Sequence, residues 1–280
     1  MAEKKYASAS DILADAQDLV VLRRSGDNHV YAVKPSLEAQ RQLYLESIAD
    51  PSERDIPAFQ GHWKLGKTGI EGSSTFLTLR LDKRALRPRG LWVPGLLEAK
   101  ALESKGKLEN GVYRDYSTVV HSVGNPHKET AEEIAKQAKS LGLGLPLIAP
   151  FKSLDYSCDR KSKYGIAISL VKSPTGLISG QDAQAQIDAL DFKSDSGFRR
   201  LGRDRDGGWN ADWNYLDYSD EDGRVEWFCG EAAREKIIEA NATLTERKYA
   251  QKIRALETQM TKLEEAQIKE RADFEKSLNQ

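Results

Sequence analysis

The sequence predicts an α+β protein with a mixed, mainly antiparallel sheet, flanking helices and a long C-terminal helix. Three observations support this fold class. Over residues 1–229 short β-rich runs alternate with helical patterns. Glycine and proline punctuate these runs, whereas residues 231–280 contain neither. We therefore expect a globular region over residues 1–229, with a sub-boundary near residue 125, and a separate helical region over residues 231–280.

The first part of the chain predicts a helix, a hairpin and a second helix. Ser8 and Asp11 have the spacing of a capping box, so a helix should begin there. Two β-rich runs, residues 19–22 and 30–33, are separated by a polar turn that contains glycine, which predicts a β-hairpin. Ser36 follows a proline and can serve as the N-cap of the second helix.

The middle of the chain predicts further strands and two helices. Residues 74–81 alternate between two faces, which is typical of a strand. Residues 128–141 and 181–190 show helical spacing of apolar residues. Additional β-like runs lie at residues 111–123, 145–154 and 164–171.

The C-terminal region predicts a coiled coil. Its apolar residues are spaced by 4, 3, 4 and 3 positions, and the pattern resumes at Phe274 after a stutter. These seam residues are Tyr249, Ile253, Leu256, Met260 and Leu263. We expect the seam to join copies of the chain into a homo-oligomer; the alternative is a helix folded back on its own domain.

The composition excludes several classes of protein. Lys and Arg number 42 against 43 Asp and Glu, a formal net charge of −1, which excludes a globally basic nucleic-acid coat and a strongly acidic tail. Two cysteines exclude a disulfide scaffold. No N-terminal signal pattern is present, and no run approaches the ~20 apolar residues of a membrane span. These features predict a cytoplasmic protein with no membrane partner.

No motif indicates a reaction. Gly61–Thr68 fits the P-loop pattern, but phosphate binding needs a buried strand before it and a helix after it. Pro57 lies where that strand would be, and Gly69 and Gly72 would break the helix, so a glycine-rich loop between strands is the better prediction. The four histidines lack metal-ligand spacing. We expect no catalytic residue, cofactor or metal site, which favours a non-enzymatic protein.

A basic cluster offers an alternative function. Five cationic residues fall within ten positions, opposed only by Asp82: Arg80, Lys83, Arg84, Arg87 and Arg89. Cationic groups of this kind bind phosphates, so nucleic acid is a possible partner. Together with Gly61–Thr68, the cluster supports the alternative of a nucleic-acid-binding protein or a phosphate-chemistry enzyme, NTPase-like or nuclease-like. The competing interpretation is a solvated surface with internal ion pairs.

Residues 203–224 show a finer pattern, in which one set of positions resembles a framework and every interleaved residue is Asn, Asp, Gly or Tyr. The framework positions include Arg203, Arg205, Trp209, Ala211, Trp213, Leu216, Ser219, Gly223 and Arg224. The interleaved positions are Asp204, Asp206, Gly208, Asn210, Asp212, Asn214, Tyr215, Asp217, Tyr218, Asp220 and Asp222. This segment, with its neighbours from residue 198 to 228, resembles the variable region of target proteins of diversity-generating retroelements, in which asparagine codons are mutated at adenines.

The resemblance implies a binding protein of a mobile element or phage, with a C-type lectin-like fold and varied side chains that form the ligand surface. The ligand-binding residues it implies are Asp204, Asp206, Asn210, Asp212, Asn214, Tyr215, Asp217 and Tyr218. Supporting framework residues would be Arg203, Arg205, Trp209 and Trp213. Two alternatives stay open, because hairpin turns select the same residue types and both tryptophans could be core residues.

These observations together predict a non-catalytic recognition protein. Its aromatic and Asp/Asn-rich surface, at about residues 203–224, would bind a protein or another macromolecular ligand, since Tyr and Trp supply rigid contact area and Asp and Asn supply adaptable hydrogen bonds.

Overall fold

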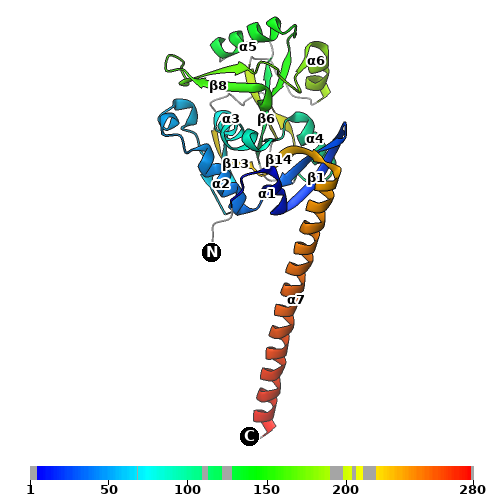
Figure 1. The fold of residues 1–280 in the computed structure, drawn as a ribbon. Helices are drawn as coiled ribbons and strands as arrows, with labels where there is room; N and C mark the ends of the chain where they lie inside the picture. The colour runs from blue at the N-terminus through cyan, green and yellow to red at the C-terminus, as the bar shows by residue number, and fades with distance from the viewer. Residues whose placement is uncertain are drawn as a thin grey trace. The chain divides into compact units, whose positions relative to one another are not determined.

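The computed structural model describes residues 5–67, 69–108, 113–121, 128–189, 198–203, 206–210 and 219–278. It divides into a globular unit, Met1–Arg234, and a helical unit, Glu235–Gln280, each of which is described by itself (Figure 1). The globular unit mixes helices with largely antiparallel sheets, so the predicted α+β class is confirmed. Within the described part of the chain, no helix has both the length and the apolar character needed to cross a bilayer.

A four-stranded antiparallel sheet joins the two ends of the globular unit, in the order β1-β2-β14-β5. The predicted hairpin is present, and Gly26 takes a positive φ of 57° in its two-residue turn. Gly230 lies where a Cβ atom would come within 2.3 Å of the Tyr31 hydroxyl, so only glycine fits between the neighbouring strands. The strands are β1 (Asp18–Ser25), β2 (Asn28–Lys34), β5 (Leu91–Trp92) and β14 (Phe228–Ala233).

A second, eight-stranded sheet follows the order β10-β7-β6-β13-β4-β3, with β11 paired to β6 and to β12. Its described pairs are antiparallel except that of β13 with β6. A separate hairpin pairs β8 (Leu154–Cys158) with β9 (Ile166–Leu170). The eight strands are β3 (Lys64–Leu65), β4 (Ile70–Ser74), β6 (Arg114–His121), β7 (Leu147–Pro150), β10 (Ile178–Ser179), β11 (Phe198–Arg203), β12 (Trp209–Asn210) and β13 (Ser219–Val225).

Two of the predicted helices begin where their capping residues lie. Ser8 and Asp11 form a complete capping box at the start of α1 (Ala9–Ala14), and the Ser36 hydroxyl accepts a hydrogen bond from the Ala39 amide at the start of α2 (Leu37–Ser47). The predicted helices of the middle region are α5 (Lys128–Ser140) and α6 (Gly180–Ala189). A further helix, α4 (Leu96–Ser104), was not expected from the sequence.

The strand predicted over residues 74–81 is wrong, because α3 (Thr75–Leu81) is a helix that continues through a π-helical turn over Asp82–Leu86. Every side chain of α3 is buried. A helix enclosed on all sides has no polar face, so it shows no helical period, and the alternation of its residues carries no information about the backbone. Its charged residue, Arg80, is buried through an ion pair with Glu53.

The helical unit consists of α7 (Arg234–Leu278), which confirms the predicted long C-terminal helix. The seam residues Tyr249 to Leu263 are all more than half exposed, at 51–71%. The coiled coil stays a prediction.

Candidate functional site

The segment of residues 203–224 begins and ends in strands of the eight-stranded sheet. On its N-terminal side β11 pairs with β12, with Arg203 opposite Trp209. On its C-terminal side β13 pairs with β4 and, at Arg224, with β6. Both ends of the segment are therefore fixed by backbone hydrogen bonds to strands of one sheet.

Glu103 of α4 holds two of the predicted framework residues. The Arg203 Nε donates to Glu103 Oε1 at 3.0 Å, and the Trp209 Nε1 donates to Glu103 Oε2 at 3.2 Å. Arg203 is only 4% exposed, so its charge needs a partner of this kind. One carboxylate thus ties the end of β11 and the start of β12 to the same helix.

The indole of Trp209 is half-buried and lies against Tyr116 of β6. The two ring centroids are 5.4 Å apart with an interplanar angle of 35°. Tyr116 is buried, and burial raises the pKa of its phenol. Trp209 also packs against core clusters that contain Leu96 and Trp227. Its ring therefore packs against the core of the globular unit, and the framework role stays a prediction.

The C-terminal end of the segment is fixed by a second set of charges. Glu226 accepts hydrogen bonds from Arg114 at 2.9 Å and from Lys34 at 3.0 Å. Burial alone would raise the pKa of Glu226, but Arg114 and Lys34 outweigh it and hold the pKa below its usual range. Ser219, at the start of β13, accepts a hydrogen bond from the His62 amide at 2.6 Å.

Few of the predicted ligand-binding side chains fall within the described residues. Asp206 is exposed and caps a turn, because its Oδ1 accepts a hydrogen bond from the Gly208 amide at 2.9 Å, while Gly207 takes a φ of 97°. The backbone of Asn210 belongs to β12. The other predicted site residues lie outside the described part: Asp204, Arg205, Asp212, Trp213, Asn214, Tyr215, Asp217 and Tyr218.

The glycine-rich stretch of residues 61–67 was predicted to be a loop between strands, but it contains a strand of its own, β3, and only its end after Leu65 belongs to the loop before β4. β3 and β4 form an antiparallel hairpin, and the Gly66 amide donates to the Gly69 carbonyl at 2.8 Å across its loop. β4 rather than a helix follows the loop. Its amides therefore do not lie at a helix N-terminus, the position that binds phosphate in a P-loop.

The basic cluster of residues 80–89 pairs with acids of the same chain. Lys83 meets Asp155 at 2.7 Å, Arg87 meets Asp82 at 2.6 Å, and Arg89 meets Glu46 at 2.7 Å. Asp82 is wholly buried, and burial raises the pKa of its carboxyl although Arg87 opposes this shift. The alternative of internal ion pairs describes these side chains better than a phosphate-binding surface.

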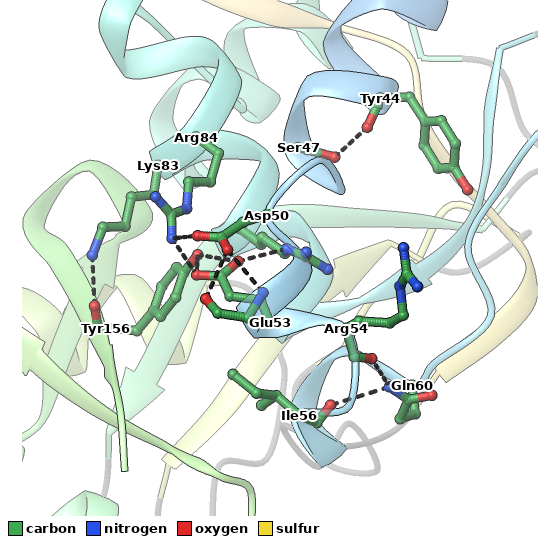
Figure 2. Close-up of polar contacts among 12 residues, drawn as sticks. Tyr44, Ser47, Asp50, Glu53, Arg54, Ile56, Gln60, Lys83, Arg84 and Tyr156 are labelled. Carbon is green, nitrogen blue, oxygen red and sulfur yellow. Dashed lines mark hydrogen bonds and ion pairs between the residues drawn. The ribbon is translucent and has the colours of Figure 1, made fainter.

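Glu53 pairs with two cations of this cluster, and Figure 2 shows its contact with one of them, Arg84. Its carboxylate is 1% exposed, lies 2.9 Å from Arg80 Nε and also pairs with Arg84. The Tyr156 hydroxyl donates to Glu53 Oε1 at 3.0 Å. Asp50 adds a second acid 2.8 Å from Arg84. Glu53 was not singled out from the sequence, because it lies in a short 3-10 helix, Pro51–Glu53, far along the chain from the arginines it neutralises.

Among the residues that the structure describes, no group of three or more His, Cys, Asp or Glu side chains could hold a metal ion.

Comparisons with protein-family models, with curated proteins and with solved structures found no match to this chain.

We expect Glu53→Gln to destabilise the globular unit by about 3–5 kcal/mol, because it leaves the buried Arg80 guanidinium without its counter-charge. Asp155→Asn is the matched control, since its ion pair with Lys83 is partly exposed and should contribute no more than ~1 kcal/mol. Urea unfolding of both variants measures the difference. Equal losses in the two variants would show that the buried Arg80–Glu53 pair contributes no more to stability than a partly exposed pair.

We expect Glu226 to make stability depend on acid pH. Because its pKa is lower in the folded than in the unfolded state, it stabilises the fold above the usual glutamate pKa of ~4.3, and this stabilisation is lost as the pH falls through the lowered value. Glu226→Gln should therefore lower the free energy of unfolding at pH 7 and approach the parent protein below pH ~4. The exposed Glu221→Gln serves as control; a Glu226→Gln deficit that is the same at both pH values would contradict the assignment.

Proposed function

We propose that this chain is a non-catalytic recognition protein that presents residues 203–224 to a protein or another macromolecular ligand and assembles through α7. One observation carries the proposal: a segment rich in Asp, Asn and Tyr lies between two anchors, Arg203 with Trp209 on Glu103, and β13 in the sheet. Fixed ends allow side chains between them to change without loss of the fold.

The composition of the segment suits recognition. Tyr215 and Tyr218 bring large, rigid, amphipathic contact area at low entropic cost, and the interleaved Asp and Asn residues bring adaptable hydrogen bonds. Binding surfaces concentrate their free energy in a few aromatic anchors of this kind. Among the described members of the set, Asp206 and Asp222 have side chains that are open to solvent.

The resemblance to target proteins of diversity-generating retroelements supports the same proposal. In that family the varied positions form the ligand surface, and the framework positions stay fixed. The C-type lectin-like fold that the resemblance implies stays a prediction. An asparagine-rich near-copy of the coding segment for residues 198–228, next to a reverse transcriptase gene, would support membership, and its absence would count against it.

Nucleic-acid binding or phosphate chemistry draws no support from the described residues. The five cations of residues 80–89 have acidic partners in the chain, and the glycine-rich loop lies in a hairpin.

We expect the interleaved residues to contribute little to stability. Replacing Asn210, Asp212, Asn214 and Tyr215 together by Ser should change the free energy of unfolding by no more than ~0.5 kcal/mol per site. Trp209→Ala should cost about 3 kcal/mol, because it removes the packing against Tyr116 and leaves Glu103 with one partner fewer. Chemical denaturation measures both.

Binding is then tested by affinity capture from the source lysate, with the fourfold variant beside the parent protein. A distal set of exposed replacements on α5, such as Glu133→Ser with Lys136→Ser, is the matched control. Ligands retained by the parent and the distal variant but lost by the fourfold variant support the proposal. Equal capture by all three, or unfolding of the fourfold variant, contradicts it.

A further inference from the structure

The apolar seam residues of α7 form a stripe along the helix, and their side chains are exposed to solvent. Tyr249, Ile253, Leu256, Met260 and Leu263 are 64%, 55%, 51%, 60% and 71% exposed. The stripe extends over about 21 Å of helix, given 1.5 Å per residue. Continuous apolar surface of this kind on a soluble protein marks an interaction site.

The positions of these residues in the heptad indicate how many helices meet. Ile253 and Met260 occupy position a, and Tyr249, Leu256 and Leu263 occupy position d. Ile253, the β-branched residue of the stripe, lies at a with Leu256 and Leu263 at d, and this combination favours two strands. Gln267 occupies the next a position and Glu270 the next d position, so the apolar stripe ends at Leu263.

The charges beside the stripe indicate the direction of the second helix. Lys252 lies at position g and Glu257 at position e of the next heptad. In a parallel pair, Lys252 of one helix lies next to Glu257 of the partner subunit, and the contact occurs twice. In an antiparallel pair position e lies against position e, and both Glu257 and Glu264 occupy that position, so carboxylates would face carboxylates.

Lys252 and Glu257 are available for these contacts. Both side chains are exposed, and neither has an ion-pair partner among the described residues of its own chain. The apolar pattern and the charge complementarity are thus satisfied together by one occupant, a second copy of this chain.

We propose that α7 forms a parallel, two-stranded coiled coil with a second copy of this chain, held by the stripe from Tyr249 to Leu263 and by the reciprocal Lys252–Glu257 pairs. Chain connectivity then gives a functional consequence. α7 begins at Arg234, one residue after β14 ends at Ala233, so both globular units are joined to the same end of the coil.

The consequence for binding rests on the proposed function, whereas the coiled coil does not. Two recognition segments on one dimer would bind a repetitive ligand bivalently. A second binding event on the same ligand becomes intramolecular, and avidity can exceed the single-site affinity by ~10²–10⁴ when the geometry allows both contacts.

The relative direction of the two helices is tested by cross-linking of the full-length chain. The variants are made in a Cys158→Ser background, which removes the exposed native thiol and keeps the buried Cys229. Gln267→Cys places a thiol at position a, and Thr258→Cys places one at position f on the outer face. Under mild oxidation a parallel coil predicts a disulfide-linked dimer for Gln267→Cys and none for Thr258→Cys. An antiparallel coil that matches the apolar layers would separate the two Gln267→Cys thiols by more than ~20 Å.

The charge pairs are tested by sedimentation of full-length variants. Lys252→Glu and Glu257→Lys should each weaken the dimer about tenfold, because like charges replace two attractive pairs, and the double variant should recover the parent affinity. Lys262→Glu with Glu265→Lys, on the outer face, is the matched control and should have no effect.

A dimer with the Gln267→Cys cross-link and recovery in the double variant supports the proposal. A monomer, a trimer, a dimer without the cross-link or a double variant weaker than both single variants overturns it. Failure of the proposed function can be distinguished from failure of the coiled-coil proposal. In the first case the dimer would stay intact, and the fourfold variant of residues 210–215 would capture the same ligands as the parent.

Discussion

The end of the proposed recognition segment and the chain directly after it form β13 and β14, which complete both sheets of the globular unit, and this constraint governs the rest of the structure. β13 lies between β6 and β4 in the larger sheet, and β14 lies between β2 and β5 in the smaller one. Val225, Trp227, Phe228 and Cys229 are buried there. Residues 203–224 therefore connect strands that belong to the core. A substitution within them must be accommodated by rearrangement of nearby residues, because otherwise both sheets would lose a central strand.

Buried charges near both ends of the segment hold these ends in place, so that a substitution between them can be accommodated within the segment. Glu103 binds Arg203 and Trp209 on one side, and Glu226 binds Arg114 and Lys34 on the other. Breaking such a pair on one side only is costly, because the remaining charge stays buried, so these contacts fix where the segment begins and ends. A framework fixed in this way is what the proposed recognition function requires.

Local signals in the sequence predicted the elements that local interactions determine. The capping box of Ser8, the hairpin around Gly26, the amphipathic α5 and the glycine-free α7 are all present. The enclosed helix α3 was predicted as a strand because nothing in its apolar residues reports the surrounding contacts. The pairing of Arg80 with Glu53 and the double contact of Glu103 with Arg203 and Trp209 also could not be predicted, since both join residues distant in sequence through the tertiary fold.

The central claim is that the ends of the segment are fixed while its interleaved side chains are free to change. Saturation mutagenesis of residues 203–224, read out as resistance of each folded variant to proteolysis, tests it most directly. The account predicts broad tolerance at the interleaved positions, from Asp204 to Tyr218, and strong intolerance at Arg203 and Trp209. Intolerance at the interleaved positions equal to that at Arg203 and Trp209 would contradict it.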